Sequence, residues 1–367
     1  MTLRLLLLVL YIYPFLVSAQ DIQQRIILIG DAGEINQDQT ILIPAAAALV
    51  LPGRTTTYFL GDNIYPDGMA LDSSGREVSI GILKSQYTPF LERQVPVYFM
   101  AGNHDWDKSG PQGLLKVEQQ AAYINKLKDK NLHFVPAAGT LGPVVTQSSG
   151  KLLTVVYDSE YWLYPHHEKS KAVIQSEKQH FLHSLDSITS TYSDKILLLL
   201  SHHPMRSYGE HGLHFSITDH IFPLRKLWKG LYLPLPIVGS LYPLLRSSIF
   251  SSGEDLTHRQ YRELIDSVTT LMAKRNNVIY ASGHDHGLQL IREGSFTQIV
   301  SGSGAKTSSI GHANDLHYRH GAQGFTVVDV YTDGRAKISY FINQAGDVNK
   351  DYEDWLIEKP TPSQTKN

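Results

Sequence analysis

The stretch that decides the fold is Arg25-Ile-Ile-Leu-Ile-Gly-Asp-Ala-Gly33, in which four large apolar residues run directly into a glycine and an aspartate. Such an uninterrupted apolar run is typical of a β-strand that is buried on both faces. Four later stretches repeat the pattern. They are Thr55 to Leu60 before Gly61-Asp62, Val95 to Ala101 before Gly102-Asn103-His104, Lys195 to Leu200 before Ser201-His202-His203, and Val278 to Ser282 before Gly283-His284. Because open α/β sheets build their sites at the carboxyl ends of strands, we expect these polar clusters to meet at one edge.

Between and after these strands, the apolar spacing predicts further elements. Apolar residues recur with helical period over 111–130, 170–187 and 261–275, which predicts three helices. Near the end of the chain, two apolar runs at 324–331 and 335–342 flank an Asp-Gly pair, which predicts a β-hairpin. The chain is therefore expected to form a mixed α/β (α+β) fold.

Composition limits the class of partner. The chain has 367 residues, of which 42% are hydrophobic, so it can bury a large core. Its 33 Lys and Arg and 35 Asp and Glu give a net charge of −2. Since binding to nucleic acid needs a basic face, we expect no nucleic-acid partner, and an anionic substrate must be attracted locally.

The N-terminus reads as a secretory signal. Arg4 precedes an apolar run from Leu5 to Val17, and Ser18 and Ala19 offer small residues for cleavage. We expect a signal peptide over 1–19, cleavage after Ala19, and a secreted, periplasmic or cell-envelope location. An uncleaved N-terminal anchor is the alternative, although the run is shorter than a usual membrane span. The chain has no cysteine, so export brings no disulfide bonds.

The five polar clusters share one chemistry. They offer carboxylate, amide and imidazole groups, a donor set that suits iron, zinc or manganese. Glycine before the ligand lets the backbone turn sharply beside a metal. A single Gly-Asp is commonly only a turn, but five such clusters in one order predict a shared metal site.

The set resembles the calcineurin-like metallophosphoesterase superfamily and, within it, the purple acid phosphatases of the small, mammalian, tartrate-resistant type. Asp31-Ala-Gly33 stands where the superfamily has Asp-x-His, and Tyr65 ends Gly61-Asp-Asn-Ile-Tyr65. The likeness extends to Glu210-His211-Gly212, to Gly283-His-Asp-His-Gly-Leu-Gln289 and to Ser301-Gly-Ser-Gly304. It implies a two-sheet β-sandwich flanked by helices. The implied catalytic domain spans 20–350, and we expect a disordered tail over 351–367, which carries proline and polar residues from Lys359 onward.

The resemblance also implies a ligand set for two metal ions. The first ion, Fe(III), would be held by Asp31, Tyr65 and His286, and Asp62 would bridge to the second. The second ion, Fe(II), Zn or Mn, would take Asn103, His202 and His284.

Four further residues have expected roles. The resemblance makes His104 and His211 the groups that orient the phosphate and protonate the leaving oxygen. From chemistry alone, His211 can equally be a solvated loop histidine, and Tyr65 a core aromatic. We expect His203 to be a pocket or packing histidine, and Asp105 to orient an imidazole or cap a helix.

The function expected is that of a dinuclear-metal phosphoesterase, an acid phosphomonoesterase that uses a metal-bound hydroxide on a small phosphorylated substrate. The alternatives are a phosphodiesterase or nucleotide pyrophosphatase on the same metal core, and a catalytically idle envelope binding protein. The stretch from Trp228 to Phe250 is apolar and aromatic but interrupted by three prolines. It is interpreted as a lid or packing insert, a membrane-surface contact, or a partner-binding patch. We expect the protein to be a monomer.

Overall fold

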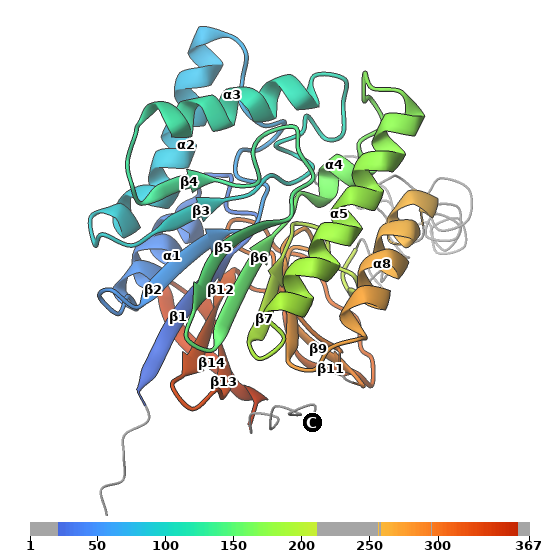
Figure 1. Ribbon diagram of the computed structural model, residues 1–367. Helices are drawn as coiled ribbons and strands as arrows, with labels where there is room; N and C mark the ends of the chain where they lie inside the picture. The colour runs from blue at the N-terminus through green and yellow to red at the C-terminus, as the bar shows by residue number, and fades with distance from the viewer. Residues whose placement is uncertain (1–20, 211–255, 257, 295, 359–367) are drawn as a thin grey trace, which may run out of the picture.

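Two mixed β-sheets form the centre of the computed structural model (Figure 1), which describes residues 21–210, 256, 258–294 and 296–358. Each sheet has seven strands. The first runs in the order β14 (Asp347–Ile357), β13 (Ala336–Gln344), β12 (Gly324–Tyr331), β1 (Ile22–Ile29), β2 (Thr55–Phe59), β3 (Val97–Phe99) and β4 (Leu132–Phe134). The second runs in the order β11 (Leu316–His320), β9 (Leu288–Glu293), β10 (Phe296–Ser301), β8 (Val278–Ser282), β7 (Ile196–Leu200), β6 (Leu152–Val156) and β5 (Val144–Ser149).

Each of the five strands that carry the polar clusters has a parallel neighbour. β1 pairs in parallel with β2, β2 with β3, and β7 with β8. Parallel neighbours end at the same edge of a sheet, so the loops after these strands lie together. The strand β1 also pairs antiparallel with β12 on its other side, which places the predicted hairpin of β12 and β13 inside the first sheet.

Burial on both faces explains the uninterrupted apolar runs. In β1, Ile26 and Leu28 belong to the apolar core between the two sheets, while Ile27 and Ile29 pack in the core beneath the helices. In β7, Leu198 and Leu200 likewise lie between the sheets. Such strands have no solvent face, which is why the expected alternation of apolar and polar residues is missing from them.

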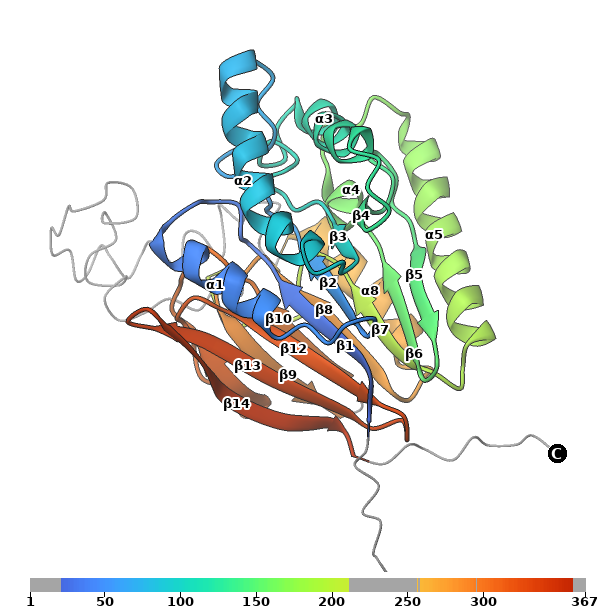
Figure 2. The same cartoon turned by 90° about the vertical axis from the view of Figure 1, so that its left-hand side faces the viewer.

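Helices cover the outer faces, as the predicted fold class requires. Figure 2 shows α1 (Gln37–Ala48) and α2 (Ser73–Leu91) next to each other on the side of the first sheet, and the two helices are in contact. The helix α5 (Lys171–Thr191) contacts α8 (Arg259–Met272) on the side of the second sheet (Figure 1). The remaining described helices are α3 (Gly113–Lys126) and the short α4 (Ser159–Leu163). The three predicted helices correspond to α3, α5 and α8, and among the described residues none of these helices is long and apolar enough to cross a membrane.

The predicted tail over 351–367 is wrong in its first residues. β14 continues to Ile357 and pairs with β13, so the folded domain extends beyond residue 350. The ring of Tyr352 stacks on that of Tyr318, with the centroids 4.6 Å apart. An edge strand is commonly polar and charged, which is why its sequence resembled a tail. Four predicted features lie outside the described residues: the signal peptide, the stretch from Trp228 to Phe250, His211, and residues 359–367 of the tail.

Candidate metal centre

The loops after five strands bring the predicted ligands to one place. Asp31, Asp62 and Asn103 follow β1, β2 and β3 of the first sheet, and the histidines follow β7 and β8 of the second sheet. Three of these loops turn through a left-handed residue: φ is 58° at Asp31, 54° at Asp62 and 71° at His284. Side chains other than glycine adopt this conformation rarely, and such residues gather at functional sites.

Tyr65 is the centre of a first cluster. Its hydroxyl lies 3.1 Å from Asp31 Oδ1, 3.1 Å from Asp62 Oδ2 and 3.2 Å from His286 Nε2. Burial and the two carboxylates raise the pKa of Tyr65 well above its usual value. A hydroxyl has one hydrogen, so it cannot satisfy all three neighbours, and this crowding of acceptors fits a cation.

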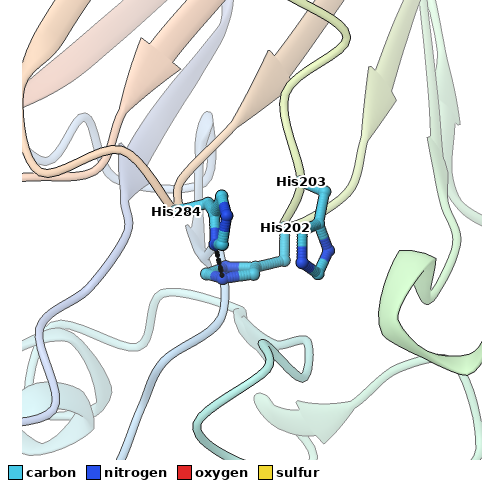
Figure 3. Close-up of side chains that lie close together, drawn as sticks. All are labelled: His202, His203 and His284. Carbon is cyan, nitrogen blue, oxygen red and sulfur yellow. Dashed lines mark hydrogen bonds between the residues drawn. The ribbon is translucent and has the colours of Figure 1, made fainter. Parts of the chain in front are cut away.

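A second cluster forms around Asn103. Its Oδ1 lies 2.9 Å from His202 Nε2 and 3.1 Å from His284 Nδ1, and these two nitrogens are 3.2 Å apart (Figure 3). His202 Nδ1 lies 2.8 Å from the carbonyl oxygen of Leu60 and therefore carries the proton. The other ring nitrogen, Nε2, faces the cluster, the arrangement seen in metal-binding histidines.

Asp62 joins the two clusters. Its Oδ2 lies at Tyr65, and its Oδ1 lies 3.4 Å from His202 Nε2. Burial opposes ionisation of this carboxyl, but His202 and His104 outweigh it and lower the pKa. One ligand atom each from Asp31, Asp62 and His202 lies within 4.8 Å of the others, and a second such group is formed by His202, His203 and His284. The two groups together suit a site for two metal ions, and Asp62 would be available to an ion in either cluster.

Two glycines are required by this close approach. A Cβ added to Gly102 would lie 2.3 Å from Asp62 Oδ1, and one added to Gly283 would lie 2.6 Å from Asp31 Oδ2. Both contacts are closer than van der Waals distance. The sequence-based expectation that glycine precedes the ligands for steric reasons therefore has a concrete basis at these two positions.

The open side of the centre is identified by side-chain exposure. The side chains of Asp31, Asp62 and His202 are at most 1% exposed, whereas His286 is 25% and His104 is 21% exposed. His104 Nδ1 lies 2.5 Å from the Pro66 carbonyl oxygen, and its Nε2 lies 3.9 Å from Asp62 Oδ2. The predicted substrate-facing histidine His104 is thus at the accessible side, while His211 is outside the described residues.

His203 lies beside the second cluster, and one ligand atom each from His202, His203 and His284 lies within 4.8 Å of the others, so the packing role expected for His203 stays a prediction. Its ring is buried, and its centroid lies 4.9 Å from that of His202 and 4.4 Å from that of His284 (Figure 3). Its Nδ1 lies 2.8 Å from Ser159 Oγ, and its Nε2 lies 3.6 Å from a carboxylate oxygen of Glu160. Nothing in the local sequence indicated that Ser159 and Glu160 of α4 would support this histidine, because no motif links them to the strand ends.

The role expected for Asp105 is wrong. Its carboxylate contacts no imidazole at hydrogen-bonding distance and caps no described helix. It accepts hydrogen bonds from the backbone N–H of Gly102 at 2.8 Å, and from the backbone and side chain of Asn63. Burial, followed by the charge of Asp62, raises the pKa of Asp105 to about 7. Asp105 therefore ties the loop after β2 to the loop after β3, and so positions the ligands on both.

Comparisons with known proteins agree with this arrangement. A profile of the calcineurin-like phosphoesterases matches residues 24–288. A comparison with curated protein sequences gave no match. Among solved structures, the chain is similar to GAP50, the anchor in the inner membrane complex of Plasmodium, with a TM-score of 0.55 and 16% identity over 92% of this chain and 89% of that chain.

Two further solved structures were found to be similar. PhoD is similar with a TM-score of 0.57 and 10% identity, over 93% of this chain and 71% of that chain. The purple acid phosphatase PPD1 from seeds of yellow lupin (Lupinus luteus) matches with a TM-score of 0.48 and 13% identity, over 89% of this chain and 52% of the lupin chain. At these identities the similarity concerns the fold.

Proposed function

We propose that this chain, which belongs to the calcineurin-like phosphoesterase family, is an acid phosphomonoesterase with a ferric ion in the cluster around Tyr65. Family membership makes it a metal-dependent phosphoester hydrolase with a site suited to two ions. We add four parts to this: the monoester preference, the acid optimum, the likeness to the tartrate-resistant enzymes and the identity of the metals.

The position of the Tyr65 hydroxyl carries the proposal. It touches both Asp31 and Asp62, and burial together with these carboxylates raises the pKa of Tyr65. A phenolate forms in such surroundings only beside a cation of high charge, and a ferric ion is the one that phenolate oxygen favours. The second cluster, with two imidazoles and an amide oxygen, suits Fe(II), Zn or Mn.

The chain's own residues do the remaining work. When bound, the two ions supply a nucleophile from water at low pH and offset the charge of the phosphate. The Nδ1 atom of His104 contacts the Pro66 carbonyl, and its Nε2 lies 3.9 Å from Asp62 Oδ2, on the side of the metal centre. In acid both ring nitrogens of a histidine carry protons, so Nε2 can protonate the departing ester oxygen.

A visible spectrum with metal quantitation tests the proposal. The purified protein should be violet, and Tyr65→Phe should abolish the absorption band because it removes the phenolate. Tyr123→Phe is a matched control, since Tyr123 pairs with the Tyr87 hydroxyl on the helices and should leave the band unchanged. A colourless protein containing only zinc or manganese would contradict the ferric assignment.

Substrate comparison separates the competing activities. We expect para-nitrophenyl phosphate to be hydrolysed faster than its bis-ester, with the optimum below pH 7. Faster hydrolysis of the bis-ester would make the chain a phosphodiesterase. Absence of turnover with metal bound would favour an idle binding protein.

Export is a separate proposal that rests on the sequence of residues 1–19. The mass of the mature protein from an exporting host checks it, because cleavage after Ala19 leaves Gln20 as the first residue.

For the stretch from Trp228 to Phe250, a variant that lacks 230–248 should partition less into liposomes if this stretch meets a membrane surface. Unchanged partitioning would reject the membrane contact.

A further inference from the structure

A lysine lies at the open side of the metal centre. The Nζ atom of Lys306 is 4.7 Å from the centroid of the Tyr65 ring, and its side chain is 31% exposed. The hydroxyl of that same ring contacts Asp31, Asp62 and His286. The ammonium group therefore lies over the same ring whose hydroxyl contacts the first cluster.

The backbone around Lys306 is fixed to the metal ligands. The N–H of Ala305 donates to the Asp31 carbonyl at 2.9 Å, and the N–H of Ser308 donates to the His286 carbonyl at 2.7 Å. The side chain of Asn36 also donates to the Ala305 carbonyl at 2.8 Å. Because the loop is bonded to two predicted ligands, the position of Lys306 relative to the centre is set by the fold.

Lys306 forms an ion pair with an exposed carboxylate. Its Nζ pairs with Glu34, whose side chain is 46% exposed. Exposed ion pairs are weak, typically about 0–1 kcal/mol, so an anion of higher charge can displace this carboxylate. A phosphate group carries more charge than a carboxylate and offers several acceptor oxygens.

We propose that Lys306 binds a second phosphate, next to the one being hydrolysed, so that the site prefers diphosphates to simple monoesters. This proposal rests on the proposed phosphatase activity and specifies its substrate class. In the reaction, the oxygen of water bonds to the terminal phosphorus, and the bond from that phosphorus to the bridging oxygen breaks. The bridging oxygen leaves with the inner phosphate, which remains bound at Lys306. One proton of water stays on the oxygen now bonded to the terminal phosphorus, and the other goes to the bridging oxygen of the inner phosphate, so that pyrophosphate and water give two hydrogenphosphate ions.

Kinetics with two substrates tests the preference. The ratio of kcat/KM for inorganic pyrophosphate to kcat/KM for para-nitrophenyl phosphate should fall about tenfold in Lys306→Gln, the usual effect of losing one charge-assisted hydrogen bond. Glu34→Gln should raise the ratio, since it frees the lysine. Lys337→Gln is the matched control, because Lys337 pairs with Glu353 in a similarly exposed setting on β13 and β14, and it should leave the ratio unchanged.

A binding experiment keeps this inference distinguishable from the proposed activity. Calorimetric titration of the metal-loaded protein with pyrophosphate and with orthophosphate should show that Lys306→Gln weakens pyrophosphate binding about tenfold more than orthophosphate binding. One outcome is that the wild type binds both anions, with Lys306→Gln weakening pyrophosphate binding more than orthophosphate binding, and yet hydrolyses neither substrate. In that case the phosphatase proposal fails and the Lys306 proposal stands.

Equal effects on both anions would overturn the inference. If Lys306→Gln lowers both kcat/KM values and both affinities by the same factor, Lys306 acts on the centre through Tyr65 and contacts no second phosphate. An unchanged ratio in Glu34→Gln together with an unchanged ratio in Lys306→Gln would likewise reject it.

Discussion

At the scale of single residues, Asp62 links the two clusters of the metal centre. Its two carboxylate oxygens face different clusters, one at Tyr65 and one at His202. The carboxylate also accepts the backbone N–H of His104 at 2.9 Å. A change at this position therefore affects both clusters and the loop that carries His104.

Asp62→Asn should reduce turnover about 100-fold or more, because it keeps the shape of the side chain but removes the charge shared by both clusters. We also expect the metal content to fall from two ions per chain toward one. Turnover of para-nitrophenyl phosphate and elemental analysis measure the two effects. Full turnover in this variant would contradict a dinuclear mechanism.

Gly102→Ala should destabilise the protein by about 2 kcal/mol and abolish activity, because the added methyl group overlaps Asp62. Gly81→Ala is the matched control. Gly81 lies within α2, and a Cβ added there meets nothing within 4 Å, so this change should stabilise by about 0.5 kcal/mol. Urea unfolding of both variants measures the difference, and equal stability of the two would show that the loop after β3 relaxes freely.

The seven predicted ligands could be located from the sequence because each follows an apolar strand and stands in a recognisable motif. The residues that position these ligands could not be located from the sequence. Asp105 looked like a partner for an imidazole, yet it binds backbone N–H groups, whose position depends on how two loops pack. The contact between His203 and Ser159 joins positions that no local pattern connects.

At the scale of elements, prediction succeeded where the apolar pattern is strong and failed where prolines, glycines or a polar edge interrupt it. β7 is apolar throughout, and β1 is apolar from Ile26 to Ile29, a pattern typical of a strand covered on both faces. α1 contains Pro44, and α2 contains Pro89 and two glycines, so their sequences argue against helices that the neighbouring sheet nevertheless stabilises. β14 was missed because its exposed edge is polar.

The β13 and β14 pair provides a pH-dependent prediction. Lys337 and Lys350 lower the pKa of Glu353 to about 2, so the folded state binds this proton less readily than the unfolded state. The stabilisation is present above pH 4.5 and is lost as the pH falls toward 2. Since these side chains are about one-third exposed, Glu353→Gln should cost only about 0.5 kcal/mol at pH 7 and less at pH 3. Urea unfolding at both pH values checks this, and a loss that does not depend on pH would be against it.

At the scale of the whole molecule, the two ends of the described chain meet inside one sheet. β1 pairs with β12 along its length, and Arg25 donates two hydrogen bonds of 2.7 Å to the carboxylate of Asp329 across that pair. The ion pair is largely buried, with side chains 16% and 12% exposed. The first sheet is thus incomplete until the last three strands have been added.

A chain that ends at Gln323 should not fold cooperatively, because it lacks β12, β13 and β14 and leaves β1 with an unpaired edge. A chain that ends at Glu358 keeps these strands and is the matched control, with stability expected to equal that of the full chain. Circular dichroism with urea titration compares the two. A sharp unfolding transition in the shorter chain would show that the remaining strands form a stable unit.

The division of the ligands between the two sheets has a thermodynamic consequence. The carboxylates and the amide come from the first sheet and the imidazoles from the second. The affinity for any ion held by both sheets therefore depends on how the sheets are aligned. By linkage, whatever shifts one sheet against the other changes the affinity for the ion, and the ion opposes that shift with the same free energy. When metal is scarce, the two sheets would therefore lose a constraint on their relative position, and the stability of the whole sandwich would fall.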